Sequence, residues 1–166
     1  MADNIEPTLE PDVAADSVVG EALGLIVVSE ELAAERYRAL AATVDPQVRP
    51  ALLTLYAAAK QNADELRGAA RARQAKLTQQ QVLELQRCTD RLRRAVLNSD
   101  FGSKPVEDDV LDYVENCEHL TFAYYCCLSS LLSAGPLKDL FRRLMDQKRR
   151  HEEAIHQCCD ALFLIW

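Results

Sequence analysis

The sequence has few of the residues that interrupt helices. Among its 166 residues are only 5 Gly and 6 Pro, and aromatic residues make up 6%. Ala and Leu recur throughout the chain, so the composition argues against a β-sandwich and favours an all-α fold. The length favours one domain, and an apolar content of 49% is enough for a real core.

The chain also lacks an excess of basic residues and has no long apolar run. Its 26 acidic residues outnumber 19 basic ones, a poor balance for binding nucleic acid. The longest apolar stretches, 23–28 and 161–166, fall far short of the roughly 20 residues of a membrane span. Residues 1–16 lack the basic start and apolar segment of a leader peptide, which predicts a cytoplasmic protein.

The six cysteines are not spaced like a secreted disulfide framework. Four of them form two adjacent pairs, Cys126-Cys127 and Cys158-Cys159, inside helical patterns. We therefore expect the cysteines to act as small core or interface residues.

Apolar periodicity predicts four long helices and one short one. The long helices are expected at about 18–43, 46–72, 106–133 and 137–166, after a disordered acidic tail over residues 1–16. Ser17 is the expected N-cap of the first helix, and a Thr78-x-x-Gln81 capping box opens a short helix in the connector at 73–105. Two tight turns and one long connector predict an antiparallel four-helix bundle with one crossover over residues 17–166.

Polar residues interrupt the inward apolar stripes near the middle of each long helix. The residues at these gaps are Glu30, Asn62, Glu118, Lys148 and His151. In an antiparallel bundle these positions meet at one level, where a buried carboxylate must find a partner. The alternative is a shifted helical register, which would place Glu30 and Glu118 at an edge of the bundle.

The first and third long helices repeat one pattern. Tyr37 follows Glu30 by seven residues, and Tyr125 follows Glu118 by the same interval. Apolar matches between amphipathic helices are common. An inward Glu followed two turns later by Tyr is not, so the two helical hairpins read as a repeat.

With these residues the chain resembles the ferritin-like superfamily, in particular its rubrerythrin-type members, over about residues 18–162. That family holds two irons with a Glu on each of two helices and a Glu-x-x-His on each of the other two. Glu30, Glu118 and His151 match three of these six ligands. The other three positions carry Ala59, Asn62 and Lys148.

The departures from the family motif favour a protein without an enzymatic role or a cofactor. An ammonium group at Lys148 can lie between the two carboxylates and repel a divalent ion. The expected closed polar core comprises Glu30, Tyr37, Asn62, Glu118, Tyr125, Lys148 and His151. The alternative that the resemblance implies is a metalloprotein for iron oxidation or peroxide reduction. Its iron, manganese or zinc would be held by Glu30, Glu118 and His151.

Two further His/Glu pairs lie mostly off the inward stripe. Glu115 and His119 are four residues apart, as are Glu152 and His156. We expect each pair to make a solvated contact along its own helix rather than to bind metal.

Two stretches are candidate contact surfaces. Residues 67–94 carry eight basic residues against Glu84 and Asp90, which is typical of a solvated helix face or a docking face. The apolar stretch from Leu162 to Trp166 cannot turn every side chain into one core. We therefore expect it to pack in a homodimer or against a partner protein.

Overall fold

A computed structural model describes residues 11–71, 77–98 and 107–163 of the protein. Every regular element in these residues is a helix, which confirms the predicted all-α class. The helices are α1 (Pro11–Ala41), α2 (Arg49–Arg71), α3 (Gln79–Asn98), α4 (Glu107–Leu131) and α5 (Pro136–Phe163).

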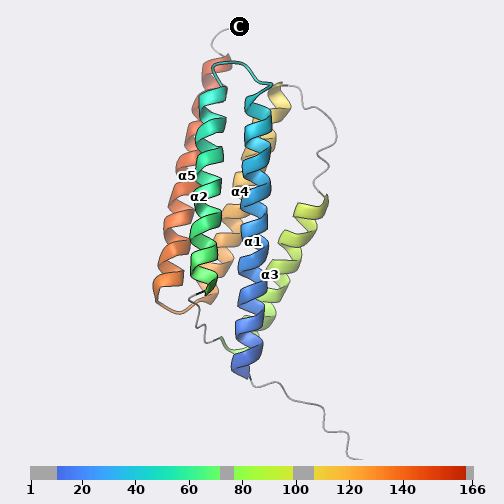
Figure 1. Ribbon diagram of the computed structural model, residues 1–166, viewed down its shortest axis with the longest axis vertical. Coiled ribbons are helices and arrows are strands. Elements are labelled where there is room, and N and C mark those ends of the chain that lie inside the picture. Colours follow the sequence, from blue (N-terminus) through green and yellow to red (C-terminus); the bar gives the residue numbers. More distant parts are fainter. Residues whose placement is uncertain (1–10, 72–76, 99–106, 164–166) are drawn as a thin grey trace, which may run out of the picture.

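The helices form two hairpins and one returning helix (Figure 1). Helices α1 and α2 are joined at one end of the molecule, and α4 and α5 at the opposite end. Between the hairpins, α3 runs back along the molecule and contacts both α1 and α4. Because α3 returns the chain to the starting end of α2, helices α2 and α4 run in the same direction.

The first helix is longer at its N-terminus than expected. It begins at Pro11, so residues 11–16 are helical and Ser17 lies inside the helix rather than at its N-cap. Proline suits the first helical position because its missing N–H is not needed there. The rest of the expected tail, residues 1–10, lies outside the described residues.

The turn between α1 and α2 is longer than predicted, so the second helix begins later in the sequence. Asp45 Oδ1 accepts a hydrogen bond from the Gln47 amide at 2.7 Å. Its backbone oxygen accepts from the amides of Val48 and Arg49. Asp45 thus holds a tight turn, and α2 begins at Arg49 rather than at residue 46.

The helix in the connector is not short: α3 has 20 residues. Its predicted capping box is confirmed, since the Thr78 amide donates to Gln81 Oε1 at 2.8 Å and the Gln81 amide donates to Thr78 Oγ1 at 3.3 Å. Leu85 and Leu92 are buried on one face of α3. This face packs on the bundle, which stabilises a longer helix than the short one that the sequence predicts.

The α4–α5 turn uses a glycine where the backbone requires one. Gly135 has a φ of 155°, a conformation that side chains disfavour. Its oxygen accepts from the Asp139 amide at 3.0 Å, in the first turn of α5. Lys138 Nζ donates to the Leu132 oxygen at 3.0 Å and so satisfies a carbonyl group just beyond the end of α4.

The core consists of two apolar clusters stacked along the bundle. One contains Leu23, Ile26 and Leu144, and the other contains Val114 and Ile155. In sequence, Glu30, Glu118 and Lys148 each fall between a member of one cluster and a member of the other. A polar layer therefore separates two apolar halves. In the described part of the chain, no helix is long and apolar enough to cross a membrane.

Candidate functional site

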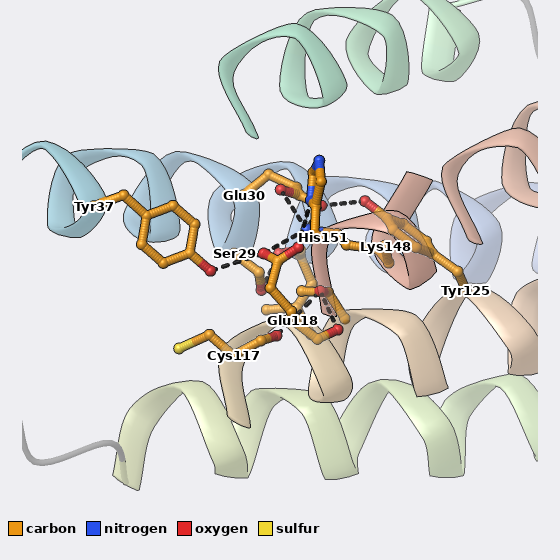
Figure 2. Close-up of polar contacts among 10 residues, drawn as sticks. Ser29, Glu30, Tyr37, Cys117, Glu118, Tyr125, Lys148 and His151 are labelled. Atoms are coloured by element: carbon orange, nitrogen blue, oxygen red, sulfur yellow. Dashed lines mark hydrogen bonds and ion pairs between the residues drawn. The ribbon is translucent and has the colours of Figure 1, made fainter. Parts of the chain in front are cut away.

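The polar layer is centred on a buried lysine from α5. Lys148 Nζ lies 3.0 Å from Glu30 Oε1 on α1 and 3.0 Å from Glu118 Oε1 on α4. All three side chains are at most 1% exposed. One ammonium group thus bridges two carboxylates from the two hairpins (Figure 2).

The two repeated tyrosines bind the carboxylates in a crossed arrangement. Tyr37 on α1 donates to Glu118 Oε1 on α4 at 2.8 Å. Tyr125 on α4 donates to Glu30 Oε1 on α1. Each hairpin therefore supplies the hydroxyl group for the carboxylate of the other (Figure 2).

His151 connects the layer to the surface. Its Nδ1 lies 2.7 Å from Glu118 Oε2, and its side chain is 12% exposed. An ionised carboxylate can only accept hydrogen bonds, so Nδ1 carries the hydrogen in this contact. His151 is the residue of the network that reaches partly toward solvent, whereas the sequence places it in the core.

Lys148 and Glu118 keep each other charged. Burial alone would raise the pKa of Glu118, but the Lys148 charge and hydrogen bonds from His151 and Tyr37 lower it to about 2. Burial alone would lower the pKa of Lys148, but the charges of Glu118 and Glu30 raise it above its ordinary value. The layer therefore holds an ammonium group between carboxylates at neutral pH.

The two tyrosines stay neutral donors. Burial and then the charge of Glu118 raise the pKa of Tyr37 well above its ordinary value. Burial and then the charge of Glu30 do the same for Tyr125. Neither hydroxyl group can ionise beside its carboxylate under ordinary conditions, so both serve as hydrogen-bond donors.

The second hairpin (α4 and α5) supplies Lys148 and His151. The first hairpin (α1 and α2) has smaller residues at the matching positions. Ala59 and Asn62 on α2 are both 1% exposed. The sequence places Asn62 in the polar core, where its amide could donate to a carboxylate. Among the described residues, however, its Nδ2 is buried without a hydrogen-bond partner.

The polar layer does not resemble an open metal site. In the described ranges, no group of three or more His, Cys, Asp or Glu side chains is placed to hold a metal ion. Lys148 Nζ occupies the space between Glu30 and Glu118. The residues present therefore do not fit the metal centre that the sequence resemblance implies.

The outer His/Glu residues pair between helices rather than along them. His119 Nδ1 on α4 lies 3.6 Å from Glu152 Oε1 on α5. His156 Nε2 on α5 lies 3.4 Å from Glu115 Oε1 on α4. The expected contacts within each helix are replaced because α4 and α5 are antiparallel, which sets the Glu of each helix beside the His of the other.

Sequence reasoning missed a disulfide. Cys88 on α3 is bonded to Cys127 on α4, with their Cα atoms 6.9 Å apart. The expectation that the cysteines act as small core or interface residues did not include this bond. Cys117, Cys126 and Cys158 are free thiols. The spacing of Leu85, Cys88 and Leu92 was the available signal, because it places Cys88 on the packing face of α3.

The basic stretch is partly neutralised by ion pairs. Arg67 pairs with Glu31 and Asp64, and Arg93 pairs with Glu21 and Asp90. These contacts agree with a solvated helix face. The predicted contact surface from Leu162 to Trp166 lies outside the residues whose side chains are described.

Comparison of the chain with protein-family models, with curated proteins and with solved structures gave no match. The polar layer, the disulfide and the outer surfaces are thus the observations from which a function can be argued.

Proposed function

We propose that this protein is a ferritin-like bundle without a di-iron centre, which acts as a non-enzymatic binding or oligomeric scaffold protein. The observation that carries the proposal is the position of Lys148. Its Nζ lies 3.0 Å from a carboxylate oxygen of both Glu30 and Glu118 in a buried layer. A lysine here supplies the positive charge that a metal ion would otherwise supply.

Charge supports this proposal. A di-iron site of the resembled type uses four carboxylates, whereas this layer offers two. A divalent ion about 4 Å from the ammonium group would meet a repulsion of about 8 kcal/mol at an effective dielectric constant near 20. Metal binding would therefore require Lys148 to leave the layer or lose its proton.

Hydrogen bonding supports it as well. Both oxygens of Glu118 are occupied, one by Lys148 and Tyr37 and the other by His151. Glu30 accepts from Tyr125 and Lys148. Buried carboxylates with these partners are satisfied without a ligand, and such a layer fixes the register of the helices rather than performing chemistry.

The competing function is a metalloprotein in which Glu30, Glu118 and His151 hold one ion. It requires Lys148 to swing out of the layer. The two functions differ in metal content, which makes them separable by one measurement.

We would incubate the protein with Fe(II) under anaerobic conditions, desalt it and measure its metal by mass spectrometry. The proposal predicts a ratio near zero for the natural protein and increased uptake for Lys148→Glu, which returns a carboxylate to the ligand position of the family. Lys60→Glu is the matched control, because Lys60 is exposed on α2. A ratio on the order of one iron per chain in the natural protein would overturn the proposal, since that stoichiometry fits a single reduced site.

The scaffold role predicts a contact surface that can be tested separately. Val28, Leu32, Leu53 and Leu83 are large apolar side chains exposed by 39–51%. Together with the segment from Leu162 to Trp166 they are candidates for contact with another copy or a partner. Light scattering should show a mass above that of one chain, and a smaller mass after deletion of residues 162–166. A mass unchanged by the deletion would exclude that segment as an oligomer contact.

A further inference from the structure

The disulfide between α3 and α4 is accessible from a surface groove. Cys88 and Cys127 are both half-buried and line a groove with a volume of about 220 Å³. Arg91 and Leu92 from α3 and Leu120 and Tyr124 from α4 also line it. A small molecule in this groove would therefore lie beside both cysteines of the folded bundle.

This disulfide is not part of a framework that pairs every thiol. Cys117, Cys126 and Cys158 are free in the same part of the molecule that the structure describes. Burial raises the pKa of both the Cys117 and the Cys126 thiols. These two thiols are therefore protonated at neutral pH and react slowly with a disulfide.

Breaking the disulfide does not open the polar layer. The charged residues of that layer come from α1, α4 and α5, whereas α3 lies against the outside of α1 and α4. Helix α3 keeps other contacts there, including buried Leu85 and Leu92 and a hydrogen bond between Thr89 and Tyr124. The disulfide can thus exchange while the protein remains folded.

We propose that this groove is a thiol–disulfide exchange site for low-molecular-weight thiols. The incoming thiolate attacks Sγ of Cys127 and forms a new S–S bond with it. The bond from Cys127 to Cys88 breaks, and its electron pair leaves on Cys88 Sγ, which is protonated from water. A second thiolate then attacks the added sulfur atom and releases reduced Cys127 and the dimeric disulfide of the small thiol, so two thiols are oxidised as one protein disulfide is reduced.

Arg91 determines the direction of the first step. It follows Cys88 by three residues on α3, so the two side chains are neighbours on the helix surface, and both line the groove. A guanidinium group near a departing thiolate stabilises its negative charge and makes that sulfur the better leaving group. The mixed disulfide is therefore expected on Cys127 rather than on Cys88.

The test is to treat the folded, oxidised protein with reduced glutathione, block free thiols with N-ethylmaleimide and map the products by peptide mass spectrometry. We expect glutathione on Cys127 and maleimide on Cys88, formed without denaturant. Arg91→Gln should slow the reaction by roughly three- to tenfold. Arg94→Gln, a change of the same charge on the same helix outside the groove lining, should leave the rate unchanged.

Three results would overturn the proposal. The first is reaction of the disulfide only after urea has unfolded the chain, which would make it a structural crosslink. The second is an adduct mainly on Cys88. The third is equal slowing by Arg91→Gln and Arg94→Gln, which would show a general effect of net charge. Circular dichroism of the treated protein would verify that it stays folded.

Discussion

Replacing Lys148 with methionine tests the polar layer most directly. Methionine keeps an unbranched side chain of similar length but removes the ammonium group. Glu30 and Glu118, both at most 1% exposed, would then face each other without the charge that bridges them. Removing one member of a buried ion pair costs about 3–5 kcal/mol, because the remaining charge is buried without compensation.

The lowered pKa of Glu118 gives a second estimate of the stability that Lys148→Met would lose. The change from an ordinary value of 4.5 to about 2 corresponds to about 3 kcal/mol of favourable interaction for this buried carboxylate. Lys148 is the first of the groups that cause the lowering. The two routes agree, so we expect Lys148→Met to lower the free energy of unfolding by about 3 kcal/mol or more.

The assay is urea unfolding at pH 7, followed by circular dichroism. Lys60→Met is the matched control, and this exposed substitution should change the stability by less than about 0.5 kcal/mol. A triple variant that also carries Glu30→Gln and Glu118→Gln should recover part of the loss, since it leaves no buried charge. If Lys148→Met is no more destabilising than the control, the ammonium group does not bridge the carboxylates and the reasoning is refuted.

Three further predictions concern the same layer and one helix end. The contribution of Glu118 to stability is present above pH 4.5 and is lost as the pH falls toward about 2, so acid titration should remove about 3 kcal/mol, and Glu118→Gln should flatten the profile in that range. Tyr37→Phe and Tyr125→Phe each remove a donor to a buried carboxylate and should each lower the urea unfolding free energy by about 1–3 kcal/mol; a loss confined to one of them would contradict the crossed arrangement. Thr78→Ala removes the N-cap of α3 and should cost about 1 kcal/mol of helix stability, measurable as faster amide hydrogen exchange in α3 alone.

The sequence predicts the helices and the residues of the polar layer because both depend on a local periodicity. The inward stripes of Leu, Ile and Val identify the packed faces, and Glu30, Glu118 and Lys148 stand out as polar residues on those faces. The crossed hydrogen bonds are not predictable in this way. They depend on how far the two hairpins are offset, which the repeat spacing does not specify.

The features that the sequence does not predict depend on how separate helices meet. The Cys88–Cys127 bond requires the position of α3 against α4, which is set by tertiary packing. The pairing of His119 with Glu152 likewise depends on the antiparallel contact of α4 and α5. The early start of α1 at Pro11 has a local cause instead. Residues 11–16 can be either helical or part of a tail, and their acidic character alone does not decide between the two.

Because only the second hairpin carries the lysine of the polar layer, Lys148 affects which hairpins can associate. A repeated sequence invites exchange, in which the first hairpin of one chain packs on the first hairpin of another. Such a pair would bring two Glu30 side chains together without a lysine, because the position that matches Lys148 is Ala59. Only unlike hairpins complete the charge balance. The asymmetry between the repeats thus acts against the pairing of two first hairpins, whereas any pairing of a first with a second hairpin keeps the lysine between the two carboxylates.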